Sequence, residues 1–223
     1  RQIEGYDCVA ASHPVPDWRG LRAAEKVIDL VTPLKAEDHL LLLISGGGSA
    51  LLPAPASGIS LEQKIVLNDA LLASGLDIHD MNVIRRLFSS LKGGRLARLA
   101  APAKITQFLL SDVPDDRLES IASGVAVADP VPFDYAKDLV IKHHLDQLDF
   151  VSTHMAALAE NDELAPVRPG DPCLDKVHST ILASNAQCRN AAANWLTTNV
   201  PGLVQLSAPE LAGEAEQMAQ NLV

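Results

Sequence analysis

The chain has 223 residues, of which 48% are hydrophobic and 21% charged, the composition of an ordinary globular protein with one large domain or two small ones. Its 28 acidic and 18 basic residues give a net charge of −10, which disfavours nucleic acid and anionic membranes as partners, because both need basic patches. The longest aliphatic run covers residues 40–44, far short of the roughly 20 residues that cross a bilayer. The three cysteines form no disulfide framework, so we expect a cytoplasmic location.

Apolar runs typical of strands alternate with helical patterns along the chain. The first helix is expected between Asp17, a capping residue, and Pro33. Ser60 and Gln63 form a capping-box pattern before the second helix, which is expected to end at Gly75. Strands are predicted at residues 6–10, 39–44, 104–110, 178–183 and 203–206, and further helices at about 78–87, 135–144, 151–160, 185–198 and 213–223.

This alternation favours βαβ units with a parallel sheet. We predict an α/β fold, a Rossmann-like three-layer sandwich with a mostly parallel sheet. No polar residue interrupts positions 40–44, so the strand at 39–44 is predicted to be central and buried. The Pro- and Gly-rich segment 165–172 is interpreted as a connection inside a single α/β domain that covers residues 1–223.

A glycine-rich segment, Ser45-Gly46-Gly47-Gly48-Ser49, directly follows the strand at 39–44. Ligands of open parallel sheets bind where the strands end at their carboxyl edge. Three glycines let the backbone approach a ligand closely and point several N–H groups at one anion. We therefore expect phosphate or carboxylate binding here; a tight turn without a ligand is the alternative.

Three well-known motifs do not fit this segment. A P-loop needs a lysine after the glycines, and none is present. The dinucleotide fingerprint G-x-G-x-x-G would need glycine at position 51, which is Leu51. The nucleophile elbow G-x-S-x-G fails as well, because Ser49 is followed by Ala50 and Leu51.

A basic cluster follows the second helix. Four cations lie within 11 residues of an otherwise acidic chain: Arg85, Arg86, Lys92 and Arg95. Concentrated positive charge beside a Gly-Gly pair suits a phosphate clamp, and Asn82 lies one helical turn before Arg85. The alternative is a solvated helix end, since basic residues favour helix C-termini.

An acidic cluster follows the strand at 104–110. Asp112, Asp115 and Asp116 lie within five residues, directly after Ser111. A carboxylate at the end of a strand can hold a divalent metal or accept a hydroxyl proton. We predict that Asp112 and Asp116 bind the metal; a plain Asp-Pro turn is the alternative.

Weaker polar signals of the same kind occur at Ser123-Gly124 and at Ser184-Asn185, the latter again just after a predicted strand. The seven histidines show no metal-binding spacing. His143 and His144 are interpreted as part of a solvated helix face.

The order of these motifs is specific. They are His13-Pro14-Val15-Pro16-Asp17, Ser45-Gly46-Gly47-Gly48-Ser49-Ala50-Leu51, Asn82 with Arg85, Ser89 to Lys92-Gly93-Gly94, Ser111-Asp112-Val113, Ile121-Ala122-Ser123-Gly124 and Gly213-Glu214-Ala215. In this order they resemble the glycerate 2-kinases, the glycerate kinase type 2 family with a C-terminal MOFRL domain, whose members are often labelled hydroxypyruvate reductases. The resemblance covers nearly the whole chain and is to the N-terminal domain of that family.

The resemblance implies transfer of the γ-phosphoryl group of ATP to the 2-hydroxyl of D-glycerate, with Mg²⁺ or another divalent metal. Its partners would be a small hydroxy acid and a nucleotide, and a homodimer is compatible with it. Arg85, Lys92 and Asp112 are then the expected catalytic residues, and Asp112 and Asp116 the metal ligands. The expected substrate- or nucleotide-binding residues are Ser45, Gly46, Gly47, Gly48, Ser49, Asn82, Ser111, Ser123, Gly124 and Asn185.

The sequence departs from the family pattern at several places. By this resemblance we expect the 223 residues to begin after the family's Gly-Lys-Ala-Ala-type segment and to stop before its MOFRL domain. Asp115 stands where the family has glycine, Val125 where it has proline, and Leu87 where it often has histidine. We therefore expect these 223 residues alone to bind a ligand weakly and to show little glycerate kinase turnover.

Two other functions compete with the kinase. A hydroxypyruvate reductase would use NAD(P)H, and the incomplete dinucleotide fingerprint argues against it. A non-catalytic domain that binds an acidic metabolite is the third reading, which the altered loops favour.

Overall fold

The structure, a computed structural model, describes residues 4–113, 115–200 and 202. It divides into two compact units, residues 1–184 and 185–223, which are described separately. The first unit contains α1 (Trp18–Val31), β1 (His39–Ile44), α2 (Gly48–Leu51), α3 (Leu61–Ala73), α4 (Ile78–Leu87), α5 (Arg95–Ala100), β2 (Lys104–Ser111), α6 (Phe133–Lys142), α7 (Asp149–Glu160) and β3 (Val177–Ser184). In the second unit the structure describes residues 185–200 and 202, of which Asn185–Asn199 form α8.

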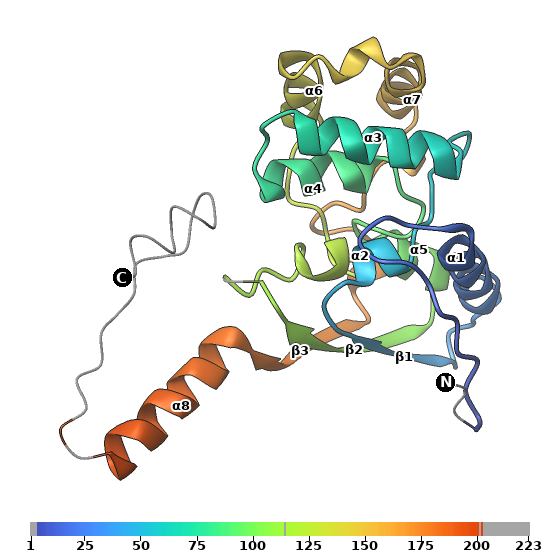
Figure 1. Cartoon of the computed structure of the whole chain (residues 1–223). Coiled ribbons are helices and arrows are strands. Elements are labelled where there is room, and N and C mark those ends of the chain that lie inside the picture. Colours follow the sequence, from blue (N-terminus) through green and yellow to red (C-terminus); the bar gives the residue numbers. More distant parts are fainter. Residues whose placement is uncertain (1–3, 114, 201, 203–223) are drawn as a thin grey trace. The chain divides into compact units, whose positions relative to one another are not determined.

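The sheet has three parallel strands in the order β1-β2-β3 (Figure 1). Ile44 lies opposite Leu109, and Ser111 lies opposite Ser184 after a register shift at Leu109 and Leu110. Because the strands are parallel, the loops that follow β1 and β2 leave the sheet at the same edge. This is the edge at which open α/β sheets bind ligands.

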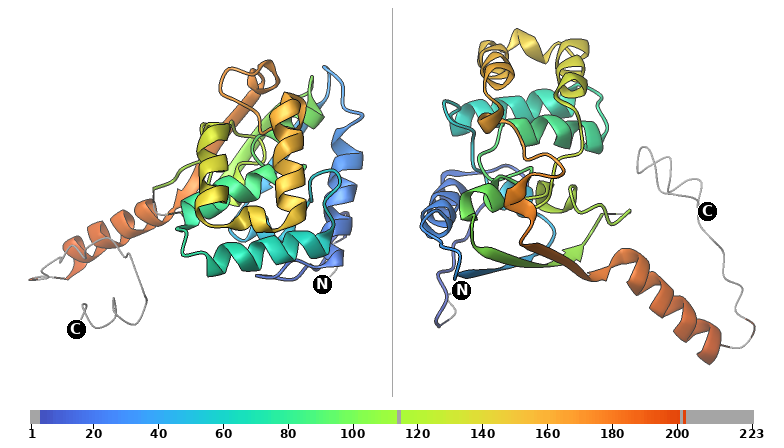
Figure 2. Two further views of the ribbon diagram at one scale, coloured as in Figure 1. Left: turned by 90° about the horizontal axis from the view of Figure 1, so that it is seen from above. Right: turned by 180° about the vertical axis from the view of Figure 1, so that it is seen from behind.

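One face of the sheet is covered by α1 and α5, as the two views in Figure 2 show. The α1 helix begins where the carboxylate of Asp17 accepts a hydrogen bond from the Gly20 N–H at 3.0 Å. Its apolar residues, with those of α5, pack against alternate side chains of the strands; this core contains Ala24, Val27, Ile28, Val31, Leu40, Leu42, Leu96, Ala97, Ala100 and Ile105.

The opposite face of the sheet is open within the described part of residues 1–184. Leu41 and Leu43 on β1 are 55% and 74% exposed, and Leu110 and Leu182 are exposed as well. The prediction of a buried central strand at 39–44 is therefore wrong for the described chain, in which β1 is an edge strand. An uninterrupted apolar run predicts that both faces can be buried, but it cannot show which elements cover them.

A second core lies among the helices α3, α4, α6 and α7. Figure 1 shows these helices as a group on the far side of α2 and α5 from the sheet. Their buried apolar residues form one cluster, which includes Leu67, Leu71, Ile84, Leu139 and Val151. The α3 helix starts with the predicted capping box, in which Ser60 and Gln63 each accept a hydrogen bond from the other's backbone N–H.

Most elements lie where the sequence predicts them. The helices after Asp17 and Ser60, the helices near 78–87, 135–144, 151–160 and 185–198, and the strands at 39–44, 104–110 and 178–183 are all present, and the α/β class with a parallel sheet is confirmed. The strand predicted at residues 6–10 is wrong: the segment is irregular and Tyr6 is exposed. The elements predicted at 203–206 and 213–223 lie outside the described residues. No helix of the described chain is long and apolar enough to cross a membrane.

A buried ion pair joins the helical group to the segment before α6. The guanidinium of Arg86 donates two hydrogen bonds to the Asp129 carboxylate, at 2.8 and 3.0 Å, and both side chains are at most 3% exposed. Asp129 also accepts a hydrogen bond from the Val131 N–H. A buried charge whose partner is removed is left unsolvated, so this pair holds the region in one arrangement.

We expect Asp129→Ala to lower the free energy of unfolding by about 3–5 kcal/mol, because it leaves the Arg86 guanidinium buried without a counter-charge. Asp7→Ala is the matched control, since it removes an exposed ion pair with Lys26 and should cost at most about 1 kcal/mol. Urea denaturation of the three proteins measures both changes. Equal losses for the two variants would contradict the role of the buried pair.

Candidate functional site

A glycine loop, residues 45–49, leads from β1 into the single turn of α2. Gly47 has φ +80°, a left-handed conformation that favours glycine. A Cβ on Gly46 would lie 2.2 Å from Oδ2 of Asp112, so only glycine leaves room for that carboxylate. The N–H groups of Gly46 and Gly47 have no hydrogen-bond partner among the described residues. The loop therefore offers free backbone donors beside a carboxylate.

Asp112 reaches the loop because β2 lies beside β1. It follows Ser111, the last residue of β2, whose hydroxyl accepts a hydrogen bond from the Val113 N–H at 3.3 Å. Ser111 is buried and Asp112 is exposed. The sheet register thus brings two polar clusters that are about 65 residues apart in the sequence into contact at one edge.

A tight turn at residues 121–124 supports the glycine loop from another side. The hydroxyl groups of Ser49 and Ser123 lie 2.6 Å apart and share a hydrogen bond. A Cβ on Gly48 would lie 2.9 Å from that of Ala122. Ser123 is fully buried and its hydroxyl is already paired, so in this conformation it positions Ser49.

The same turn is tied to the segment that connects α4 with α5. The N–H groups of Gly93 and Gly94 donate to the carbonyls of Ser123 and Gly124, at 3.1 and 2.8 Å. These bonds place Lys92, the residue just before Gly93, next to the glycine loop. Its Nζ donates to the Ser49 carbonyl at 2.6 Å, and the residue is only 3% exposed.

Arg85 lies on α4, close enough for its charge to lower the pKa of Lys92. Its guanidinium donates to the side-chain oxygens of Asn68 at 2.6 Å and of Asn82 at 3.3 Å. Asn82 therefore positions Arg85. The Arg85 Nε is buried and has no hydrogen-bond partner among the described residues, so one donor of this side chain is available.

The structure thus brings together the glycine loop, Asp112, Ser123 and Lys92, which the sequence predicts as one site. Asn185 begins α8 in the second unit, so its place in the site stays a prediction. Arg86, a member of the basic cluster, is committed to Asp129, and Arg95 donates to the carbonyls of Arg86 and Lys92. These two arginines serve the fold.

Known proteins of similar sequence identify the family of this chain. Residues 1–157 match the family model described as "Domain of unknown function (DUF4147)", which is more than half of the chain. The chain belongs to the DUF4147 family. A relative from Agrobacterium vitis, named "Putative hydroxypyruvate reductase", is 40% identical over 201 residues, which are 87% of this chain and 50% of the relative.

Two further relatives carry kinase names. A D-glycerate 2-kinase from Thermotoga maritima is 40% identical over 149 residues, 67% of this chain and 36% of that protein. The crystal structure of a glycerate kinase from Thermotoga maritima superposes with a TM-score of 0.77 at 32% identity, covering 89% of this chain and 45% of that one. The DUF4147 chain therefore spans about half the length, or less, of these relatives.

Sequence reasoning did not single out Lys64, whose charge acts on Lys92. Lys64 lies on α3 on the same face as the buried Leu67 and Leu71, and its Nζ donates to the Phe88 carbonyl at 2.8 Å. A signal was present: the 3–4 spacing of apolar residues places position 64 on the buried face, where a lysine is unusual.

Burial changes the protonation of these cations. It lowers the pKa of Lys64 to about 7, helped by the charges of Arg85 and Arg95. Burial also holds the pKa of Lys92 well below its usual value, with Lys64 and Arg85 as further causes. Burial lowers the pKa of Arg85 as well. Loss of water disfavours a charged ammonium, and neighbouring charges of the same sign add to the effect.

The acidic residues around Asp112 fit a magnesium ion only in part. Mg²⁺ commonly takes one or two carboxylates together with substrate phosphates. Asp112 offers an exposed carboxylate, and Oδ1 of Asp116 is buried with no hydrogen-bond partner in the described chain. Asp115 is instead paired with Arg117 at 2.5 Å. No group of three His, Cys, Asp or Glu among the described residues could hold a metal ion by itself.

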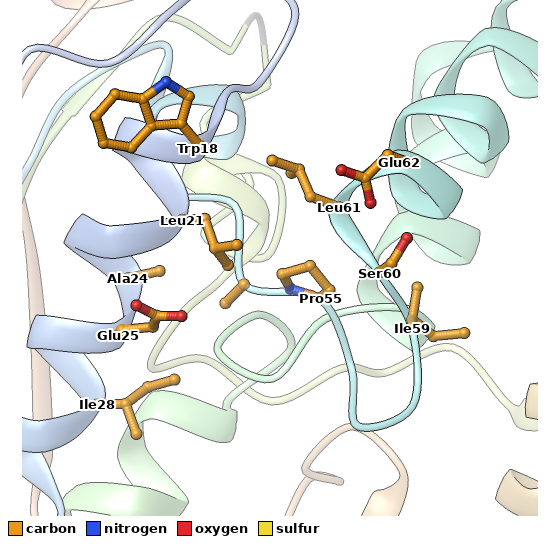
Figure 3. A pocket seen from close by; sticks show the side chains of 11 residues that line it. Trp18, Leu21, Ala24, Glu25, Ile28, Pro55, Ile59, Ser60, Leu61 and Glu62 are labelled. Carbon is orange, nitrogen blue, oxygen red and sulfur yellow. The ribbon is translucent and has the colours of Figure 1, made fainter.

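A pocket of about 510 Å³ lies between α1 and the segment that enters α3 (Figure 3). Trp18, Leu21, Ile28 and other apolar side chains line it, and Glu25 and Glu62 are its charged residues. Two carboxylates repel phosphate and carboxylate groups, so this pocket does not suit the anions predicted from the sequence.

We expect the free energy of unfolding to rise with pH between about 7 and 10.5. Because the pKa of Lys64 is near 7 in the folded chain and near 10.5 when unfolded, the unfolded chain binds more protons in this window. Lys64→Met should lower the slope by up to about 1.4 kcal/mol per pH unit. Urea titrations at pH 7, 8 and 9 measure the slope, with exposed Lys137→Met as the control. The same slope in Lys64→Met and the wild type would show that Lys64 keeps an ordinary pKa.

Gly46→Ala should move Asp112, because the new methyl group would lie within 2.2 Å of the carboxylate. We expect a loss of about 1–3 kcal/mol of stability, the usual cost of overpacking. The loss should be largely relieved in the double variant Gly46→Ala with Asp112→Ala, which removes the obstacle. Additive losses in a double-mutant cycle would mean that the two residues do not touch.

Proposed function

We propose that this chain carries the phosphoryl-handling part of an ATP-dependent kinase that transfers phosphate to the 2-hydroxyl of D-glycerate. One observation carries the proposal: the glycine loop has the Asp112 carboxylate against Gly46 and the Lys92 ammonium at the carbonyl of Ser49. Phosphoryl transfer needs little covalent chemistry from the protein. It depends on positioning and on the neutralisation of charge, for which backbone donors, cations and a carboxylate are suited.

Each part has a distinct role in this proposal. The free N–H groups of Gly46 and Gly47 bind phosphate or carboxylate oxygens. Lys92 and Arg85 neutralise the charge that develops on the transferred group. Asp112 orients the attacking hydroxyl and accepts its proton, or holds Mg²⁺, with Asp116 as a second ligand. When bound, the metal would neutralise phosphate charge. A cytoplasmic location and a homodimer are part of the same proposal.

The kinase names of the relatives support this function, and the label hydroxypyruvate reductase on the Agrobacterium vitis relative supplies the competing one. A reductase must bind NAD(P)H. In this chain Leu51 occupies the position of the third glycine of the dinucleotide fingerprint, and it belongs to α2. A larger side chain at that point interferes with the close helix–strand packing of such sites, which favours the kinase.

Ligand-induced thermal stabilisation of the purified chain separates these functions. A ligand that binds only the folded state raises the melting temperature. We expect ATP with Mg²⁺, and D-glycerate, to raise it, and NADH to leave it unchanged. In Asp112→Asn the effect of ATP should no longer depend on Mg²⁺, whereas exposed Asp138→Asn should behave as the wild type. Stabilisation by NADH alone would reject the kinase in favour of the reductase, and stabilisation by D-glycerate alone would favour the non-catalytic binder.

A further inference from the structure

The contacts of Lys64 with the described residues do not account for its burial. The residue is 9% exposed, and its Nζ has one hydrogen-bond partner among the described residues, the Phe88 carbonyl. That carbonyl also accepts the Ala56 N–H at 3.3 Å, so it would keep a partner without the lysine. A buried ammonium with one neutral acceptor costs free energy, which an apolar residue at this position would avoid.

Lys92, in the segment between α4 and α5, has a similar environment. Its ammonium also has a single described partner, a backbone carbonyl. An ammonium has three donors, so each lysine keeps two N–H groups without an acceptor among the described residues. The buried Nε of Arg85 is a further unpaired donor. Three basic side chains, from α3, α4 and the segment after α4, thus have hydrogen-bond donors without a partner among the described residues.

No carboxylate of the described chain forms an ion pair with these three side chains. The ion pairs of the described residues involve Arg19, Lys26, Arg86, Arg98 and Arg117. The other charged group that acts on Lys64 is Arg95, and His154 is a basic group whose pKa Lys64 helps to lower. Arg95 is itself influenced by the Asp129 carboxylate, which is paired with Arg86. The charges that act directly on Lys64 and Lys92 are all positive, in a chain whose net charge is −10.

We propose that Lys64, Lys92 and Arg85 together bind a doubly charged oxyanion, the phosphate group of a phosphorylated substrate or product, next to the glycine loop that Lys92 contacts. The inference rests on the proposed function only for which molecule carries this phosphate. Two lysines and an arginine with unpaired donors match the charge and the several acceptor oxygens of a phosphate better than those of a carboxylate. Anion binding would stabilise the charged form of both lysines and so take up protons from solution.

Isothermal titration of the purified chain with inorganic phosphate at pH 8 tests this site. We expect Lys64→Met to weaken phosphate binding at least about tenfold, since it removes a charge-assisted hydrogen bond. The same variant should melt a few degrees higher than the wild type without phosphate, because it buries no amine with unpaired polar groups. Exposed Lys137→Met should leave both values unchanged. Lys64→Arg, which keeps the positive charge, should retain part of the binding.

Proton uptake gives a readout that a structural lysine would not change. Titrations at pH 8 in two buffers of different ionisation enthalpy measure the protons bound with phosphate, and the number should fall in Lys64→Met. Unchanged phosphate affinity in folded Lys64→Met would overturn the proposal. So would D-glycerate binding that phosphate does not compete with and that Lys64→Met weakens, because the site would then hold a carboxylate. Phosphate binding that depends on Lys64, in a chain that ATP with Mg²⁺ does not stabilise, would support this site and reject the kinase.

Discussion

The segment between α4 and α5, residues 88–94, is the constraint on which the rest of the structure depends. Its backbone bonds to residues 54–56 through Phe88 and Ser90, and to the turn at 121–124 through Gly93 and Gly94. Its side chain Lys92 reaches the glycine loop. One short segment therefore connects the helical group, the loop after β1 and the turn that supports this loop. A change in its path would move all of these parts together.

The fold could be predicted from the sequence as far as local signals reach. Asp17 and Ser60 are capping residues, and the helices begin directly after them, because these side chains satisfy backbone N–H groups within one turn. The exposure of Leu41 and Leu43 could not be predicted in this way. An apolar strand shows that it can be buried, but its neighbours are set by contacts far apart in the sequence. The strand predicted at residues 6–10, which begins at Tyr6, is absent from the structure. An apolar run alone does not show that a neighbouring strand is there to pair with it.

Some residues of the candidate site could likewise be predicted from the sequence, and others could not. The glycines and Asp112 could be placed at one edge because parallel strands bring the ends of β1 and β2 together. The sequence could not separate the arginines of the basic cluster. Arg86 forms an ion pair with Asp129, 43 positions away in the sequence. The Nε of Arg85 has no hydrogen-bond partner among the described residues. Lys64 was not predicted, because it lies far from the basic cluster at residues 85–95 in the sequence. The helical period nevertheless places position 64 on the buried face of α3.

Stability and function make opposite demands on the buried face of α3. Leu67 and Leu71 on that face contribute to the helical core, whereas Lys64 on the same face places a charge out of water. His154 on α7 is a further basic group near Lys64, and burial lowers its pKa as well. Since an apolar side chain at position 64 would stabilise the fold, the lysine is best explained by a charge that arrives from outside the chain. In our proposal an anion next to the glycine loop supplies that charge, and its binding is linked to the protonation of the buried lysines.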